Sequence, residues 1–269
     1  MNITPLTPII GAEIGGIDLG KPLNDETISV VRAALVEWKV IFFRDQDITT
    51  SEHIAFARRF GDLEIHPFAP KKEGHPEVLE LENGPNNKSR INVWHSDVTW
   101  RFEPSLGSIL RAVEVPEVGG DTMWANMEAA YEGLDDALKE KIEGRIASHD
   151  FMATFGRPLS DEKRAEMRER YPIAHHPVVR THPESGRRSI YVNAAFTSGI
   201  DDMDPDESHE ILQRLYFQSR IPEYQVRFQW RCNSIAFWDN RGAQHYPVSD
   251  YFPAVRRMER VTVVGDRPA

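Results

Sequence analysis

The residues QVRFQWRCNSIAFWD (225–239) carry the clearest sign of the fold of this chain of 269 residues. Val226, Phe228 and Trp230 alternate with polar residues, which is the period expected of an antiparallel strand with one buried face. The polar residues that follow lead into a second apolar run, 235–239, which we interpret as another strand. This pattern predicts a fold that is mainly β.

Further short strands are expected on both sides of these residues, with helices between them. The expected strands are 40–43, 78–81, 91–95, 108–113, 121–125, 189–193, 225–231 and 258–264. The expected helices are one that Asn24 can cap and that runs through Ile28, Val31, Leu35 and Trp38, one over 50–60 behind the capping-box pair Thr49 and Glu52, one over 127–142, a surface helix at 160–170 and one that begins behind Asp204. Short strands interrupted by helices indicate a double-stranded β-helix, or jelly roll, with flanking helices, formed by residues 1–269 as a single domain.

The composition favours a small-molecule partner. With 42 acidic and 32 basic residues the formal charge is −10, which disfavours attraction to nucleic acid or to anionic lipid. Basic side chains near a site are therefore informative, because they act against the overall field. No run approaches the ~18 apolar residues of a membrane span, and the first residues lack the features of a secretion signal, so a cytoplasmic location is expected.

The chain contains one cysteine, Cys232. An intramolecular disulfide and a zinc site built from several cysteines are therefore excluded. We expect Cys232 to be a buried strand residue.

In Trp94-His95-Ser96-Asp97 an imidazole and a carboxylate stand two positions apart. On extended backbone both side chains project from the same face, so they can bind one ion together. Iron(II) oxygenases use two histidines and one carboxylate on one face of an octahedron and leave the remaining positions open. The alternative is a surface pair that makes only local hydrogen bonds, because His-x-Asp alone is a weak signal.

A third ligand is suggested by WDNRGAQHY (238–246), in which His245 is followed eleven positions later by Arg256. A guanidinium fork near a metal-bound histidine is the expected anchor for the far carboxylate of a dicarboxylic acid. Ten histidines compete for the role of ligand, and Arg256 beside Arg257 can equally be a surface residue. On the residues alone, both interpretations stay open.

The order of short motifs along the chain resembles the taurine dioxygenase family, the TauD/TfdA group of iron(II)/2-oxoglutarate dioxygenases. The matching segments are PIIGAEIGGIDL at 8, FFRDQ at 42, RRFGDLEIHP at 58, WHSDVT at 94, GGDTMW at 119, HPVVRTHPESG at 176, YVNAAFT at 191, QVRFQW at 225, WDNRGAQHY at 238 and RRMERVTVVGD at 256. The resemblance implies an oligomeric oxidoreductase with a jelly-roll fold that uses Fe(II), 2-oxoglutarate and dioxygen. It implies that His95, Asp97 and His245 are the iron ligands and that Thr122 and Arg256 hold the distal carboxylate of 2-oxoglutarate.

The resemblance also points to the substrate. It implies that a small anion is held by His66, Arg260 and the backbone N–H of Val98, between apolar walls formed by Trp100, Phe155 and Phe196. The implied reaction hydroxylates the carbon next to a sulfonate, in taurine or a related alkylsulfonate, and releases sulfite and an aldehyde.

Departures from the taurine pattern concern the recognition of the amine. Ala69 and Ile91 stand where taurine-specific members carry a tyrosine and an asparagine, and Trp100 replaces a phenylalanine. Asn92, one position away, is the residue that could compensate. A sulfonate or sulfate ester with a larger or less polar tail is therefore favoured over taurine itself.

Several alternatives remain. Within the family these are dioxygenases of alkyl sulfate esters or of aryloxyalkanoates. Outside it, a non-catalytic jelly-roll module could use the same residues for a structural metal or a sugar, although three ligands suit an open catalytic site better than a closed one. A zinc hydrolase would lack an evident general base. The polar loop 83–93 is long enough to serve as a lid.

Overall fold

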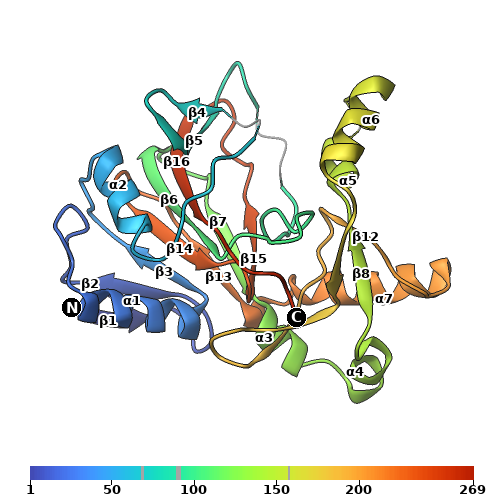
Figure 1. Cartoon of the computed structure of the whole chain (residues 1–269). Helices are drawn as coiled ribbons and strands as arrows, with labels where there is room; N and C mark the ends of the chain where they lie inside the picture. Colours follow the sequence, from blue (N-terminus) through green and yellow to red (C-terminus); the bar gives the residue numbers. More distant parts are fainter. Residues whose placement is uncertain (68–69, 89–91, 157) are drawn as a thin grey trace.

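The computed structural model describes residues 1–67, 70–88, 92–156 and 158–269 and is dominated by one eight-stranded sheet (Figure 1). In spatial order this large sheet contains β1 (Asn2–Pro5), β2 (Ala12–Gly15), β3 (Val40–Phe43), β14 (Ile235–Asp239), β6 (Gly107–Glu114), β16 (Arg256–Val263), β5 (His75–Asn83) and β4 (Lys71–Lys72). The central pairs β3–β14, β14–β6 and β6–β16 are antiparallel. The prediction of a mainly β protein is confirmed.

Smaller sheets and helices complete the fold. One sheet joins β13 (Gln225–Phe228), β7 (Thr122–Asn126) and β15 (Ala243–Pro247), another joins β12 (Thr197–Ile200), β8 (Ile146–His149) and β9 (Ala174–Pro177), and β10 (Val179–Thr181) pairs with β11 (Arg188–Ile190). The helices are α1 (Asp25–Trp38), α2 (Thr50–Ala57), α3 (Met127–Glu132), α4 (Asp136–Ile142), α5 (Phe151–Phe155), α6 (Asp161–Arg170), α7 (Pro205–Gln218) and the 3-10 turn η1 (Pro222–Tyr224). Within the described ranges, none of the helices has the length and apolar character needed to cross a membrane.

The two-residue period of the central strands buries both faces of the large sheet. Ile235 and Phe237 of β14 belong to the core beneath α1 and α2, whereas Trp238 faces the sheet β13–β7–β15. In that second core Phe42 stacks on Phe228 with ring centroids 4.0 Å apart. The molecule is therefore layered as helices, large sheet and small sheet, and the space between the two sheets is where a site can form.

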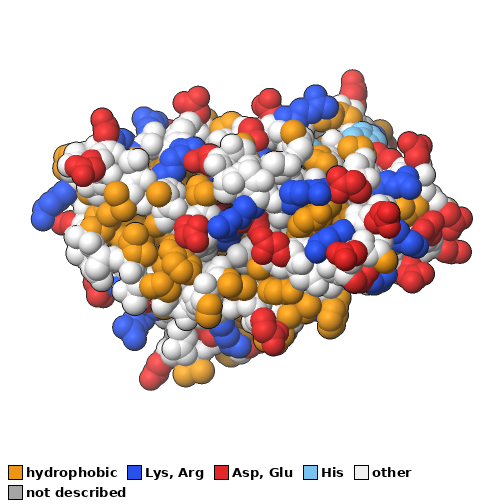
Figure 2. Space-filling model, turned by 90° about the horizontal axis from the view of Figure 1, so that it is seen from below, with side chains coloured by type: hydrophobic (Ala, Val, Ile, Leu, Met, Phe, Trp, Pro, Cys, Tyr) orange, Lys and Arg blue, Asp and Glu red, His pale blue; other side chains and the backbone are white. Residues whose placement is uncertain are grey.

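Predicted helix starts are confirmed where capping residues signalled them. The Asn24 side chain accepts from the Thr27 N–H at 2.8 Å at the start of α1. Thr49 and Glu52 form the expected capping box of α2. Acidic and basic side chains are interspersed with apolar ones on the face shown in Figure 2, so this face carries no single sign of charge.

The prediction of one helix over 127–142 is wrong. Helix α3 ends at Glu132, and Asp135 begins α4 by accepting from the Leu138 N–H at 2.8 Å. Gly133 lies between them against Tyr224, where an added Cβ would come within 1.9 Å of the tyrosine hydroxyl. The break is therefore required by packing against η1, which the local sequence does not reveal.

Other boundaries also differ from expectation. Strand β13 ends at Phe228, and the chain then turns, so that Cys232 is exposed and the prediction of a buried strand cysteine is wrong. The expected strand 91–95 is reduced to a single antiparallel bridge at His95. Residues 89–91, which include part of the expected lid, lie outside the described residues.

The buried His53 is expected to make the free energy of unfolding depend on pH. Its fully buried Nε2 lies 3.2 Å from the Ile109 carbonyl oxygen, and burial lowers its pKa to about 4. An unfolded histidine titrates near ~6.5, so the unfolded chain binds the extra proton first as pH falls. We expect this residue to lower the free energy of unfolding by about 3 kcal/mol between pH 7 and pH 4.

His53→Gln keeps a donor without the titration, so urea unfolding should show a smaller loss of stability on acidification than in the wild type. His209→Gln, an exposed site on α7, is the control and should leave the pH dependence unchanged. Identical pH profiles for His53→Gln and the wild type would contradict this account.

Candidate functional site

Two distant histidines are brought face to face by the backbone. The His95 N–H donates to the His245 carbonyl at 3.1 Å and the His245 N–H donates to the His95 carbonyl at 2.8 Å. This reciprocal antiparallel pair directs both side chains to the same side, and their ring centroids are 4.2 Å apart. Asp97, two residues beyond His95, completes a buried group whose candidate ligand atoms all lie within 4.8 Å of one another.

The donor atoms of this group fit a metal ion. The Nδ1 of His95 lies 2.8 Å from the Val93 carbonyl oxygen, which can only accept, so Nδ1 carries the proton and Nε2 keeps a lone pair. That Nε2 is 3.8 Å from an oxygen of Asp97. A backbone carbonyl that fixes the tautomer of a ligating histidine is a usual feature of metal sites.

The electrostatics keep all three groups deprotonated near neutral pH. Burial lowers the pKa of His95, and burial together with the neighbouring His95 ring lowers the pKa of His245 to about 3. Burial alone would raise the pKa of Asp97, but the charge of the Arg260 guanidinium holds it well below its usual range. Two neutral imidazoles and a carboxylate are therefore available to a cation without displacing protons.

Arg260 on β16 lies directly beside this group. Its Nη1 is 3.0 Å and 3.2 Å from the two carboxylate oxygens of Asp97. His66 lines the same cavity, and burial followed by the Arg260 charge lowers its pKa to about 4. Because the protein carries a net negative charge, the positive charge of Arg260 next to the candidate metal ligands indicates a binding position for an anion.

The cavity has a volume of about 450 Å³ and is lined by all the residues that the sequence assigned to metal, 2-oxoglutarate and anion binding. Val98, Trp100, Phe155 and Phe196 line it together with His95, Asp97, His245, Thr122, Arg256, His66 and Arg260. Helix α5 supplies Phe155, and the segment after Asn193 supplies Phe196. The structure therefore brings the eleven candidate residues into one space.

Arg256 and Thr122 meet at the far end of the cavity. The Arg256 Nε donates to the Gly120 carbonyl at 3.0 Å, and its Nη2 lies 3.4 Å from the Thr122 hydroxyl oxygen. The Trp230 indole N–H also donates to that oxygen, at 3.0 Å. Because the Thr122 oxygen accepts twice, its own proton is left to donate into the cavity.

Some lining residues had no sequence signal. Asn83 of β5 is one of them, and it reaches the cavity because β5 pairs with β16 with Asn83 opposite Arg256 in the register. Asn92, considered as a substitute amine contact, lines a second cavity with Arg220 and Tyr246 instead. Ala69 and Ile91 lie outside the described residues.

Comparisons with known proteins agree along nearly the whole chain. The model of the family described as "Taurine catabolism dioxygenase TauD, TfdA family" matches residues 2–262. The chain is 37% identical to an alkylsulfatase of Acinetobacter baylyi, over 99% of this chain and 86% of the relative. It is 34% identical to an alpha-ketoglutarate-dependent sulfate ester dioxygenase of Pseudomonas putida, over 100% and 91%. Among solved structures, a putative alpha-ketoglutarate-dependent taurine dioxygenase from Burkholderia xenovorans has a TM-score of 0.88 and 39% identity, with 100% and 94% coverage.

Removal of the carboxylate tests the metal assignment. We expect Asp97→Ala to weaken Mn(II) binding, measured by calorimetry, by about 100-fold or more, because Arg260 would then face the dication without compensation and a charge pair at ~4 Å contributes several kcal/mol. Glu103→Ala removes an exposed carboxylate nearby in the chain and should leave the affinity unchanged. Equal Mn(II) affinities for Asp97→Ala and the wild type would refute the assignment.

Proposed function

Because the chain belongs to the taurine catabolism dioxygenase TauD, TfdA family, we propose that His95, Asp97 and His245 hold its iron and that the adjoining cavity takes a sulfur-containing anion. The protein is a 2-oxoglutarate-dependent dioxygenase, and its cofactors are Fe(II), 2-oxoglutarate and dioxygen. Two imidazoles and one carboxylate with open positions beside them suit this chemistry.

We assign the distal carboxylate of 2-oxoglutarate to Arg256 and Thr122. Burial lowers the pKa of Arg256, which means that its charge is poorly solvated and gains from an anionic partner. The free proton of the Thr122 hydroxyl and the remaining guanidinium N–H groups can donate to the two oxygens of one carboxylate. The other end of the dicarboxylate would then face the three metal ligands.

The observation that carries the substrate proposal is the place of Arg260. Its guanidinium lies within 3.2 Å of both Asp97 oxygens and in the same cavity as His66. A sulfonate or sulfate group held by these residues and by the Val98 N–H would lie beside the metal, with the carbon that bears it directed towards the reacting position.

The rest of the cavity favours an apolar tail. Trp100, Phe155 and Phe196 supply aromatic surface, and the relatives include an alkylsulfatase and a sulfate ester dioxygenase. We therefore favour an alkyl sulfate ester or a long-chain alkylsulfonate over taurine.

In the proposed reaction the protein positions and shields the reactants. Fe(II) and 2-oxoglutarate, when bound, supply an oxidant from dioxygen while 2-oxoglutarate becomes succinate and carbon dioxide. Arg260 and His66 fix the anion, and Phe155 and Phe196 exclude water from the carbon next to it. After that carbon gains a hydroxyl group, the C–S bond of a sulfonate breaks to give an aldehyde and sulfite. In an alkyl sulfate the C–O bond breaks instead, giving an aldehyde and sulfate.

We further propose that the large sheet and the sheet β13–β7–β15 are the two halves of a double-stranded β-helix, since they share a core and enclose the cavity.

A single domain over 1–269, a homo-oligomer, a cytoplasmic location and the lack of a nucleic-acid partner remain predictions. The non-catalytic module is not favoured, because the chain belongs to a dioxygenase family. An aryloxyalkanoate, held through its carboxylate by the same Arg260 and His66, is the alternative substrate.

The co-substrate assignment predicts a selective defect. Arg256→Lys keeps the charge and loses the planar fork, so the 2-oxoglutarate concentration needed for half-maximal activity should rise about 10- to 100-fold while Mn(II) affinity is unchanged. Arg257→Lys, on the next and exposed position of β16, is the matched control and should behave as the wild type. An unaltered 2-oxoglutarate requirement in Arg256→Lys would contradict the assignment of Arg256 to the distal carboxylate of 2-oxoglutarate.

The substrate proposal is tested with hexyl sulfate, hexanesulfonate, taurine and an aryloxyacetate, scored by succinate, sulfate and sulfite. Hexyl sulfate or hexanesulfonate should be used at least as well as taurine. A taurine preference above about 100-fold, roughly 2.7 kcal/mol, would contradict the proposal. Arg260→Ala should abolish the formation of sulfate and sulfite, while slow decarboxylation of 2-oxoglutarate continues. Arg260→Lys should recover part of the coupled turnover.

A further inference from the structure

Val98 has a strained backbone at a decisive point of the cavity. Its φ of 49° places a β-branched residue in the left-handed region, which such residues rarely adopt. Among the described residues, its N–H has no acceptor, and the residue lines the cavity next to Asp97. A conformation of this kind persists only when the surroundings enforce it.

One buried histidine holds the residues that follow Val98. The Nε2 of His176 on β9 lies 2.9 Å from the Thr99 carbonyl oxygen and 2.8 Å from the Arg101 carbonyl oxygen. Since carbonyl oxygens only accept, Nε2 carries the proton and donates to both. The Arg101 N–H in turn donates to the Val98 carbonyl at 3.0 Å. A single N–H therefore fixes the turn on which Val98 lies.

The Thr99 side chain is held from the same side. Asn193 accepts from the Ala195 and Phe196 N–H groups through Oδ1, at 3.2 Å and 3.1 Å, which orients its amide. Its Nδ2 then donates to the Thr99 hydroxyl oxygen at 3.0 Å. The hydroxyl proton is left for Nδ1 of His149, also at 3.0 Å. These buried contacts join the turn to the Phe196 wall of the cavity.

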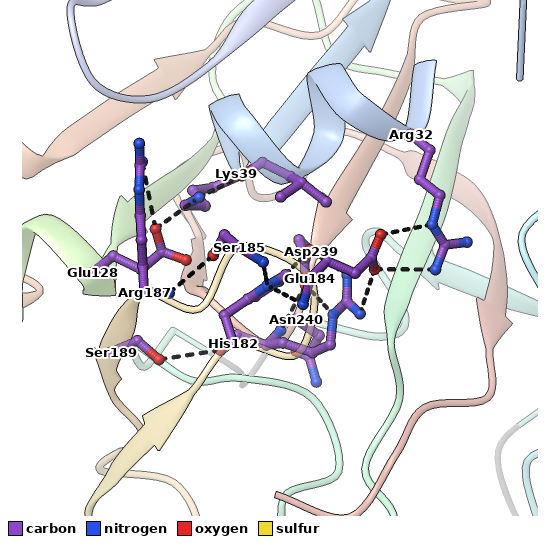
Figure 3. A network of polar contacts seen from close by, with 12 residues as sticks. Arg32, Lys39, Glu128, His182, Glu184, Ser185, Arg187, Ser189, Asp239 and Asn240 are labelled. Atoms are coloured by element: carbon purple, nitrogen blue, oxygen red, sulfur yellow. Dashed lines mark hydrogen bonds and ion pairs between the residues drawn. The ribbon is translucent and has the colours of Figure 1, made fainter. Parts of the chain in front are cut away.

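A second histidine of the same segment, His182, belongs to a polar network with Asp239 and Glu184 (Figure 3). Its Nδ1 accepts from the Glu184 and Ser185 N–H groups at 3.2 Å and 3.1 Å, so Nε2 is the donor to Asp239 at 3.0 Å. The imidazole and the carboxylate are both fully buried. His182 therefore anchors the end of β14, where the chain turns towards His245.

The anchored turn holds Asp97 through its backbone. Arg241 donates to Asp239 from Nε and Nη2 at 2.8 Å and 2.7 Å, and its Nη1 pairs with Glu184 at 2.7 Å. Between them, the Asn240 side chain accepts from the Asp97 N–H at 2.6 Å and donates to the Asp97 carbonyl at 2.9 Å. Both main-chain groups of Asp97 are thus satisfied by one amide.

We propose that residues 176–184, HPVVRTHPE, are the positioning element of the site, in which His176 directs the Val98 N–H at the substrate anion and His182 fixes Asp97 for the metal. This inference rests on the proposed function, because it presumes the anion and metal positions assigned above. Neither histidine is among the described residues that line the cavity, so both act through the groups they hold.

Substitution of His176 and substitution of His182 should weaken the binding of different ligands. A purely structural role would predict the same loss for both ligands. We expect His176→Leu to weaken binding of hexyl sulfate to the complex with Mn(II) and N-oxalylglycine by about 10- to 100-fold, with Mn(II) affinity nearly unchanged. We expect His182→Leu to weaken Mn(II) binding by about 10- to 100-fold. His176→Gln and His182→Gln place an N–H near the lost Nε2 donor and should restore most of each affinity.

Both affinities are measured by anaerobic calorimetry, alongside urea unfolding of each variant. His175→Gln, at the neighbouring exposed position, is the control and should retain both affinities. Where a leucine variant fails to fold, Thr99→Val decides, because it removes only the hydroxyl contacts and should weaken hexyl sulfate binding alone.

Equal losses of both affinities in the two histidine variants, or no rescue by glutamine, would overturn the positioning role while leaving the proposed function intact. If the wild type binds Mn(II) but not hexyl sulfate, hexanesulfonate or an aryloxyacetate, the proposed function fails, and the inference fails with it.

Discussion

The reciprocal backbone pair between His95 and His245 is the constraint around which the site is built. It joins a segment without regular structure to strand β15, and it places two imidazoles on the same side of the chain. The extended backbone then carries Asp97 to the same side. Because these are main-chain contacts, the convergence of the three side chains depends on how the strands pair as well as on their identity.

Buried charges are the second constraint on the structure, and the charged side chains behind the site form ion pairs. Lys39 and Glu128 form an ion pair that is almost fully buried and that belongs to the network shown in Figure 3. Arg241 is held by Asp239 and Glu184. Such pairs stabilise weakly but cost much if one member is removed, so they favour a unique arrangement of the chain behind the site. Arg256 differs from them, because it faces the cavity and its partner is proposed to be a ligand.

The proposed contacts of Arg260 and His66 with the substrate anion explain how one family can accept different anions. In the proposed site a sulfonate, a sulfate ester and a carboxylate would all offer oxygens to Arg260 and His66, whereas their tails would meet different surfaces. Selectivity should therefore reside in the wall around Phe155 and Phe196, and less in Arg260 and His66. In the proposed site Arg260 and His66 would determine where the reacting carbon lies, and the aromatic wall would determine which molecules can bring it there.

The sequence by itself determined the elements whose signals are local. The alternation of Val226, Phe228 and Trp230 predicted burial correctly, and the capping residues Asn24 and Thr49 predicted helix starts, because neighbours in the chain set both features. The motif order also pointed to the family. It selected candidate residues from distant segments that the structure brings into a single cavity.

Only the tertiary structure decided the features that depend on contacts between distant segments. The break at Gly133 follows from the approach of Tyr224, and the exposure of Cys232 follows from where β13 stops pairing. Asn83 enters the cavity because it lies opposite Arg256 in the pairing of β5 with β16, while Asn92 lines the other cavity. Register and packing are set by the sum of many distant contacts, and no local pattern of residues encodes them.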